Sequence, residues 1–362
     1  MNLFNSLVQI IENIPKLNQE YLIRLVYQQV LTSITTNFNG NMKAISQCLS
    51  VISSCIDNLT PIIMSCPEEF DFNTLMNGLY SYLSNSETYD SALDAIISVG
   101  NVLVEQFATY LTPVIQHLFT NFEDPSQSDM IIQTCYTIEE LSKGTRTVML
   151  TCCEQLLQKL IEMLNSELID SKVKCSIIHA ISGLAYGVGY NNFTPFRQYI
   201  INEIQNTTVG LLNMNMDYND EDNAEFFQDM MESIIEFFGR IVEKGDESVL
   251  NFIENPITIC LQLGELLRGS HGYIKQEVLY SKICYFFYSL FRLPFIGNSP
   301  QCQQIFTQNV LEVISNAYNI VDDIDGYENL TEPVEALYQS LCQIGLLQMP
   351  QSIQQQHRFF QK

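Results

Sequence analysis

The sequence predicts an all-α fold, built as a solenoid of antiparallel helix pairs that forms a right-handed superhelix. Three observations lead to this prediction. Apolar residues recur at helical spacing in nearly every segment, as Ile96, Val99 and Leu103 do within residues 89–107. Strict period-two alternation is hard to find, and neither Asn-Gly dipeptide is flanked by alternating strands. The predicted helices also recur in pairs, roughly every 40 to 50 residues.

The helix pairs are separated by residues that break helices, such as Pro67 and Pro125. In chain order, the predicted pairs are residues 21–37 with 41–58, 70–84 with 88–107, 109–122 with 127–143, 146–165 with 170–188, 195–214 with 222–244, 247–268 with 271–292, and 301–320 with 330–347. A leading helix over residues 2–14 has no partner. The repeat length is that of HEAT or armadillo repeats, whose helix pairs must stack to bury their apolar faces.

These elements predict one HEAT-repeat array over residues 1–348, with about seven helix pairs. The polar, Gln-rich tail over residues 349–362 is expected to be frayed. The leading helix lacks a mate, and no terminal repeat has the polar outer face that a cap requires. We therefore expect the chain to be part of a longer solenoid.

The composition excludes several classes of function. Lys and Arg total 17 against 41 Asp and Glu, a formal net charge of -24. This charge argues against nucleic-acid binding and against docking on anionic lipid, and favours basic protein partners. The 11 cysteines are scattered without a C-x-x-C motif, which indicates reduced, buried thiols. We find no signal peptide, and no uninterrupted apolar run approaches the ~20 residues needed to cross a bilayer.

The sequence predicts no catalytic, metal or cofactor site, and so no enzyme. The chain has 4 histidines, and no two have the i, i+4 spacing of a helical zinc site. Gly183, Gly187 and Gly189 fail the dinucleotide-binding pattern, because no strand precedes them and Asn192 takes the third glycine position. We interpret these glycines as helix C-caps.

One acidic helix face is unusual. Its five carboxylates are spaced three and four residues apart, so they form one stripe on a helix; the residues are Asp222, Glu225, Asp229, Glu232 and Glu236. No Lys or Arg lies between Arg197 and Arg240 to offset their charge. The simplest interpretation is a solvated acidic face, but in a second helix of a solenoid pair the stripe favours a basic ligand. Asp90 and Asp94 form a smaller stripe in an earlier second helix.

Three segments of the chain match the motifs of one protein family. The first, residues 226–242, is similar to a helix in the C-terminal half of that family. Its matching residues are Asp229, Glu232, Ser233, Glu236, Phe238, Ile241 and Val242. The second, residues 90–110, has the family's acidic start and its closing Phe107 and Tyr110. The third, residues 172–199, resembles a V-K…I-x-x-x-(F/I)-G-(D/G)-I-A pattern that leads to a Tyr-containing next helix; its matching residues are Val173, Lys174, Ile177, Ile181, Leu184, Ala185 and Tyr199.

The family that these three segments resemble is importin-β, the nuclear import receptor. The resemblance implies a HEAT-repeat receptor that shuttles between cytoplasm and nucleus through the pore. Its implied partners are a basic importin-α-type adapter or basic cargo, Phe-Gly nucleoporins, and Ran-GTP if an N-terminal half is present. Asp229, Glu232 and Glu236 become groove carboxylates, with Asp222, Glu225, Asp90 and Asp94 as further candidates.

For Phe-Gly slots the resemblance suggests Leu118, Phe119 and Phe122, although core packing is the better interpretation. The family stacks inner-face tryptophans on basic side chains, whereas this chain has no Trp. Tyr and Phe could take their place, more weakly. The alternative function is a HEAT-repeat scaffold subunit of another protein complex.

Overall fold

The computed structural model describes residues 19–36, 40–166, 168–213, 216–243, 245–268, 272–296, 310–323 and 328–343. Every regular element in these ranges is a helix. The chain divides into two units, Met1–Gly189 and Tyr190–Lys362, called unit 1 and unit 2 here. The predicted leading helix (2–14) and polar tail (349–362) lie outside the described residues.

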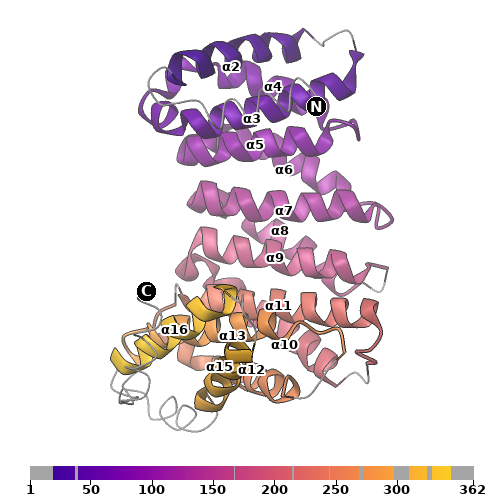
Figure 1. Cartoon of the computed structure of the whole chain (residues 1–362). Helices are drawn as coiled ribbons and strands as arrows, with labels where there is room; N and C mark the ends of the chain where they lie inside the picture. Colours follow the sequence, from indigo (N-terminus) through magenta and orange to yellow (C-terminus); the bar gives the residue numbers. More distant parts are fainter. Residues whose placement is uncertain are drawn as a thin grey trace. The chain divides into compact units, whose positions relative to one another are not determined.

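The described part of unit 1 contains four helix pairs. In chain order its helices are α2 (Gln19–Thr35), α3 (Met42–Ser65), α4 (Phe72–Tyr82), α5 (Tyr89–Leu103), α6 (Ala108–Asn121), α7 (Ser128–Thr145), α8 (Leu150–Leu164) and α9 (Ser171–Val188). Helices α3, α5, α7 and α9 lie side by side and form the front layer of this unit (Figure 1). Helices α4, α6 and α8 lie behind them and form its rear layer. The predicted all-α repeat solenoid is confirmed.

Unit 2 follows the same plan of consecutive helices. Its described helices are α10 (Tyr190–Leu212), α11 (Glu221–Glu243), α12 (Glu254–Leu266), α13 (Gln276–Phe291), α15 (Leu311–Asp323) and α16 (Glu328–Gln343). Helix α13 packs between α11 and α16, and α10 packs against both α11 and α12. The predicted pair 301–320 with 330–347 corresponds to α15 and α16, although residues 301–309 lie outside the described part.

The observed ends of α5 and α7 differ from the predicted ends at residues 107 and 143. Each helix ends before a residue with a positive φ. Residues 88–107 were expected to form one helix, but α5 ends at Leu103 because Val104 adopts φ 48°. Arg146 (φ 53°) ends α7 in the same conformation, and Gly189 ends α9 with a positive φ of 82° but a different ψ. The three sites are 42 and 43 residues apart (146 − 104 and 189 − 146). Each marks the point where the chain leaves the front layer.

Helix α3 is longer than predicted and continues through Pro61 to Ser65. Among the described helices, α3 alone is long and apolar enough to cross a membrane by length and composition. This is weak evidence, because a core helix passes the same test. The apolar face of α3, which includes Leu49, Ile52 and Ile56, is fully buried inside unit 1.

Hydroxyl groups join neighbouring front-layer helices at a constant sequence separation. Ser46 and Ser53 of α3 form hydrogen bonds of 2.7 and 2.6 Å with Ser91 and Ser98 of α5. The partners in each pair are 45 residues apart. The hydroxyls of Tyr89 (α5) and Thr134 (α7) repeat this separation at 3.0 Å. The repeat length expected from the sequence is thus present in the contacts.

Two of the predicted C-cap glycines have a different role. Gly189 ends α9, as expected, but Gly183 and Gly187 lie inside that helix. A Cβ atom at Gly183 would lie 2.7 Å from the Cα atom of Glu139, and one at Gly187 would lie 2.0 Å from the carbonyl oxygen of Ser142. The C-cap interpretation is therefore wrong for both, since these glycines let the backbones of α7 and α9 approach closely.

Candidate protein-binding site

The described cysteines have the environment of packing residues. Those at positions 48, 55, 135, 152, 153, 175, 260 and 284 are buried, as predicted, and the described cysteines form no disulfide. Burial raises the pKa of the Cys55 and Cys284 thiols to about 12. A nucleophilic cysteine needs a lowered thiol pKa, so these two thiols are poorly suited to catalysis.

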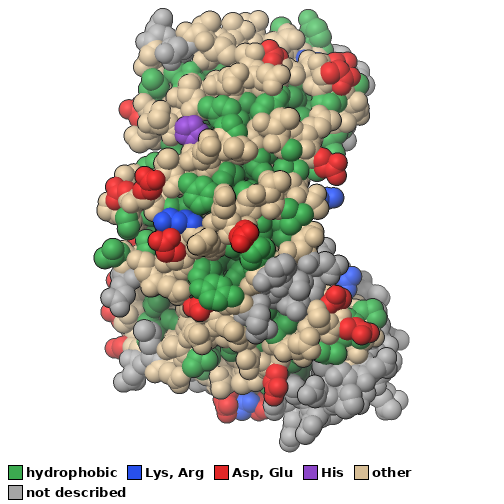
Figure 2. Space-filling model, turned by 180° about the vertical axis from the view of Figure 1, so that it is seen from behind, with side chains coloured by type: hydrophobic (Ala, Val, Ile, Leu, Met, Phe, Trp, Pro, Cys, Tyr) green, Lys and Arg blue, Asp and Glu red, His purple; other side chains and the backbone are tan. Residues whose placement is uncertain are grey.

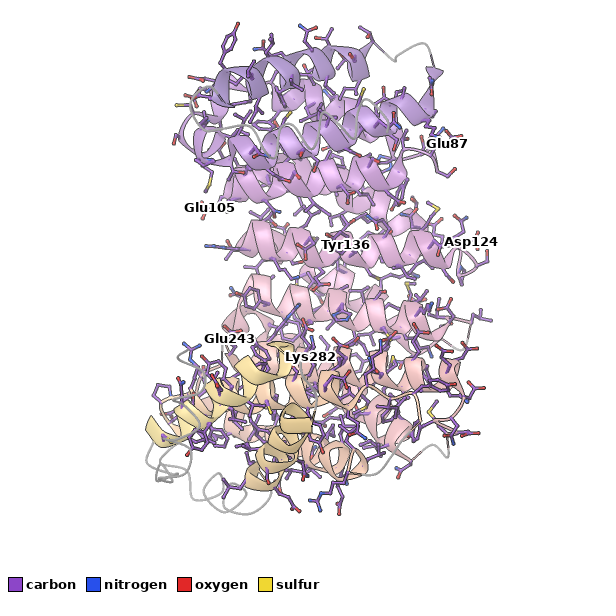
Figure 3. The ribbon with its side chains drawn as sticks, viewed as in Figure 1. Glu87, Glu105, Asp124, Tyr136, Glu243 and Lys282 are labelled. Carbon is purple, nitrogen blue, oxygen red and sulfur yellow. The ribbon has the colours of Figure 1, made fainter. Side chains whose placement is uncertain are left out.

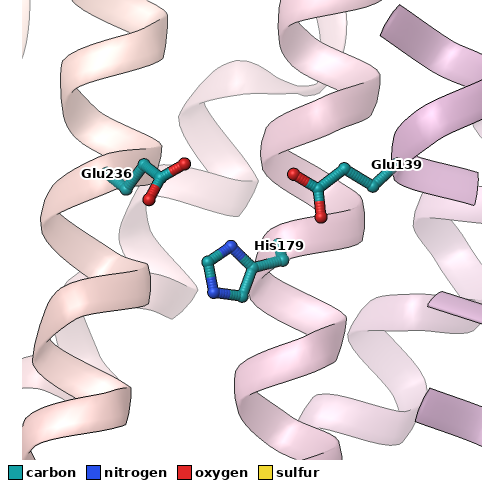
Figure 4. A group of neighbouring side chains, drawn as sticks. All are labelled: Glu139, His179 and Glu236. Atoms are coloured by element: carbon teal, nitrogen blue, oxygen red, sulfur yellow. The ribbon is translucent and has the colours of Figure 1, made fainter. Parts of the chain in front are cut away.

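The described histidines also pack against neighbours. His117 stacks on Tyr80, with ring centroids 6.3 Å apart. His179 of α9 faces Glu139 of α7, and the candidate ligand atoms of the two lie within 4.8 Å of each other (Figure 4). Glu139 already forms a 2.8 Å ion pair with Lys143. Glu236, also drawn in Figure 4, belongs to α11 of unit 2.

The acidic stripe lies on α11, where the sequence predicted it. Asp222 and Glu225 in its first half are exposed, whereas Asp229, Glu232 and Glu236 are half-buried. The helix begins after Asp220, whose carboxylate accepts a 3.0 Å hydrogen bond from the Asn223 backbone N–H. This cap and the acidic first turn suit the positive end of the helix dipole. The apolar faces of α11 are buried, including Phe237 and Phe238.

Glu232 and Glu236, in the second half of the stripe, are paired with basic side chains. Lys282 of α13 lies 2.7 Å from Glu236 and 3.1 Å from Glu232, and Arg240 forms a further ion pair with Glu236. The sequence suggested that no nearby cation offsets this charge. That expectation is wrong for Glu232 and Glu236, because Lys282 reaches them from a helix some 46 residues further along the chain.

The charge state of Lys282 follows from its surroundings. Burial lowers its pKa, but hydrogen bonds and charge interactions with Glu236 and Glu232 outweigh burial, so the pKa is raised overall. Lys282 is therefore protonated at neutral pH. Two cations, Lys282 and Arg240, face two carboxylates, so the charges of Glu232 and Glu236 are balanced by these ion pairs.

A second group of carboxylates lies in the front layer of unit 1. We call Asp90 and Asp94 of α5 with Asp129 of α7 the unit 1 acidic cluster. Burial, and then the charge of Asp129, raise the pKa of Asp90. Burial and the charge of Asp90 raise the pKa of Asp94, against a hydrogen bond with Gln133 that lowers it. Among the described residues, no Lys or Arg forms an ion pair with these three carboxylates.

The sequence interpretation missed two members of this surface. Asp129 and Tyr136 come from α7, one repeat after α5, and nothing in the sequence near Asp90 points to them. Tyr136 is 46% exposed and lies on α7 in the front layer (Figure 3). Burial raises its pKa, as do the charges of Glu140 and Asp94. Tyr136 thus places an exposed aromatic ring beside the cluster. The sequence suggested a Tyr or Phe in such a position, because the chain has no Trp.

The other two carboxylates of α7 share one basic partner on the same helix. Lys143 forms ion pairs of 2.8 Å with Glu139 and 2.6 Å with Glu140. The front layer of unit 1 therefore has an unpaired acidic part around Asp90 and Asp94 and a paired part around Lys143. A basic ligand gains most at the unpaired part, because its charge relieves the repulsion between the carboxylates.

The face seen from behind in Figure 2, turned by 180° from the view of Figure 1, also carries acidic side chains. They are scattered, with few basic ones, and hydrophobic side chains show between them (Figure 2). Of the residues considered for Phe-Gly slots, Leu118 and Phe122 are buried, and Phe119 packs edge-on against Phe122 with centroids 6.4 Å apart. For Leu118 and Phe122 the expectation of core packing is confirmed.

Comparison with known proteins identifies the family. The sequence pattern of the family described as "Importin subunit beta-1-like, TPR repeats" matches residues 5–264. Importin subunit beta-1 of Schizosaccharomyces pombe is 22% identical over 144 residues, which is 40% of this chain and 17% of that protein. The present chain thus spans a small part of this relative.

Solved structures show the same fold. Importin β crystallised in a polyethylene glycol condition superposes with a TM-score of 0.76 and 12% identity, covering 94% of this chain and 41% of that one. A complex of Kap95 with Nup1 gives a TM-score of 0.69 and 13% identity, covering 95% and 40%. These likenesses are to about two fifths of each receptor. With the family match over most of its length, the chain belongs to the importin subunit beta-1-like family.

Proposed function

We propose that this chain is part of a nuclear transport receptor and binds a Lys- and Arg-rich segment of an adapter or cargo for nuclear import. The observation that carries the proposal is the unit 1 acidic cluster. Asp90 repels both Asp94 on its own helix and Asp129 on α7, and all three carboxylates are exposed. Among the described residues, no Lys or Arg forms an ion pair with them. The exposed Asp222 and Glu225 of α11 offer a second acidic surface, in unit 2.

A basic segment suits both surfaces for the same physical reason. An incoming ammonium or guanidinium group forms charge-assisted hydrogen bonds with carboxylates and lowers their mutual repulsion. Tyr136 can stack on an arginine or lysine beside Asp94, in the way expected of an aromatic residue on a cation-binding surface. The net charge of -24 draws a basic partner from a distance, and salt weakens that attraction.

The family suggests the biological setting of this binding. Relatives include a receptor solved with a nucleoporin, Nup1, and Kap121p bound to Ste12p and to Pho4p. By extension, this chain corresponds to the C-terminal half of a receptor that shuttles between cytoplasm and nucleus and passes the pore by contacting Phe-Gly nucleoporins. Its predicted adapter is of the importin-α type, and control by Ran-GTP would require the N-terminal half.

Removing the unpaired charges should weaken binding. In the double variant Asp90→Asn/Asp94→Asn, we expect a labelled hexa-arginine peptide to bind about five-fold more weakly at low salt, because two charge contacts of modest strength are lost. The variant Asp222→Asn/Glu225→Gln should cause a similar loss in unit 2. Fluorescence anisotropy titrations at several salt concentrations would measure both affinities and their salt dependence.

A matched control separates a site from a diffuse charge effect. Glu154→Gln/Glu162→Gln removes two exposed carboxylates from α8, in the rear layer of unit 1. Its change in net charge equals that of each test variant. The affinity of this control should stay within about two-fold of the unchanged protein. An equal loss in the control would mean that the peptide responds only to total charge, and would contradict the proposed surfaces.

A further inference from the structure

We infer that Lys282 occupies the cation-binding position of the α11 stripe, so that unit 2 shields part of its acidic surface from a basic partner with a side chain of its own. The inference rests on the proposed function, since it concerns a ligand rich in arginine or lysine. It makes Lys282 a specificity-determining residue. A partner reaches Glu232 and Glu236 only by displacing the Lys282 ammonium group.

The geometry places Lys282 where such a ligand group would bind. Its Nζ atom lies 2.7 Å from Glu236 Oε2 and 3.1 Å from Glu232 Oε1, so one ammonium group bridges two carboxylates one helical turn apart. The side chain of Lys282 is 26% exposed, so it lies at the surface of the unit. A lysine carries its charge on a flexible four-carbon stem and can swing away when another cation arrives.

Close packing of two helices brings Lys282 into reach. A Cβ atom at Gly239 of α11 would lie 3.0 Å from the ring of Tyr285 on α13, so a larger residue at position 239 would crowd the contact. Tyr285 also donates a 2.9 Å hydrogen bond to Glu243 (Figure 3 labels Glu243 and Lys282). At the other end, the Lys275 backbone N–H donates to the Gln228 side chain at 3.0 Å. Lys282 lies between these two contacts.

Charge counting shows what this pairing does. Glu232 and Glu236 contribute two negative charges, and Lys282 and Arg240 contribute two positive ones. A basic ligand therefore gains little Coulomb energy here while Lys282 stays in place. Once Lys282 is displaced or neutralised, one net negative charge returns to a half-buried position where charge interactions are stronger than in water.

Unit 1 shows the same arrangement without the shield. There Asp94 of α5 faces Gln133 and Tyr136 of the next front-layer helix, both uncharged at neutral pH. Thus a cation faces Glu232 and Glu236 in unit 2, whereas neutral polar groups face Asp94 in unit 1. This difference allows the inference to be tested in both directions.

The first test removes the shield. In the full chain, Lys282→Gln should bind a labelled hexa-arginine peptide about three-fold more tightly than the unchanged protein, with a steeper salt dependence. Lys282→Arg keeps the cation and should restore the original affinity. Lys159→Gln is the matched control, because it makes the same change in net charge on α8, where Lys159 pairs with Glu162 at 3.3 Å. It should leave the affinity within about 1.5-fold.

The second test adds a shield to unit 1. Gln133→Lys should pair with Asp94 and weaken peptide binding about three-fold. Its expected effect is opposite to that of Lys282→Gln, so a general loss of folding cannot mimic both results. Circular dichroism of each variant would show that the helices are intact.

The outcomes separate the inference from the proposed function. The inference is supported if Lys282→Gln binds the peptide more tightly than the unchanged protein and the control Lys159→Gln does not. Unchanged binding in Lys282→Gln overturns it, and the proposed function still stands if Asp90→Asn/Asp94→Asn weakens binding. Peptide binding by Lys282→Gln but not by the unchanged protein keeps the inference and overturns the unit 1 site. Absence of binding in both overturns the two together.

Discussion

Phe287→Ala is expected to lower the free energy of unfolding by about 4 kcal/mol, the largest effect of any substitution considered. Phe287 lies on α13 and is fully buried. Its ring contacts Phe286 edge-on at 5.3 Å and stacks on Phe291 at 6.3 Å between centroids. Alanine would remove this apolar surface and leave a cavity in the core of unit 2, which the surrounding helices can fill only partly.

Urea denaturation followed by circular dichroism would measure this loss. Phe287→Leu should cost much less, about 1 kcal/mol, because it keeps most of the apolar volume. Tyr273→Ala is a control in the same unit: Tyr273 is 59% exposed, and its loss should change the free energy of unfolding by less than about 0.5 kcal/mol. A similar cost for Tyr273→Ala and Phe287→Ala would contradict the packing of α13 described above.

Gly187→Ala should lower the free energy of unfolding by about 3 kcal/mol, although alanine is normally the better helix former. The added methyl group would lie 2.0 Å from the Ser142 carbonyl oxygen of α7. That atom belongs to the backbone, so α7 and α9 must move apart to make room. Gly183→Ala should have a smaller effect of the same sign, because its contact with Glu139 is 2.7 Å.

Two other helical glycines are controls with the opposite expectation. Gly78 in α4 and Gly210 in α10 have no atom within 4 Å of an added Cβ. Alanine at either site should stabilise the protein by up to about 1 kcal/mol, because it restricts the unfolded chain. Thermal melts of the four glycine-to-alanine variants, at positions 78, 183, 187 and 210, would show whether each is more or less stable than the unchanged protein. A stabilising Gly187→Ala would show that the two helices are further apart than described.

Helix positions were largely predictable because they depend on local patterns. Apolar spacing and breaker residues located the helix pairs to within a few residues over most of the described chain. The exceptions have local causes that the apolar pattern does not contain. Helix α5 ends early at Val104, which takes a positive φ that valine rarely adopts. Helix α3 continues past a proline that the sequence interpretation took as beyond the helix end.

Contacts between repeats were not predictable from one sequence. The carboxylates of α11 form a stripe because they lie three and four residues apart on one helix. The stripe itself could therefore be predicted from the sequence. The Lys282 ammonium group that pairs with two of them is 46 to 50 residues away in sequence. The glycines of α9 were misread for the same reason, since their neighbours are on α7. Asp90 and Asp94, which ranked below the stripe in the sequence interpretation, are more exposed to a ligand than Glu236.

The most direct test of the proposed binding surface uses the absence of tryptophan from the chain. Tyr136→Trp places a single reporter beside Asp94, and Leu150→Trp places one on α8 in the rear layer, at a position with similar exposure (46% and 38%). We predict that hexa-arginine peptide changes the emission of Tyr136→Trp at low salt, that high salt reverses the change, and that Leu150→Trp does not respond. A response of Leu150→Trp with none from Tyr136→Trp would contradict binding at the front layer of unit 1.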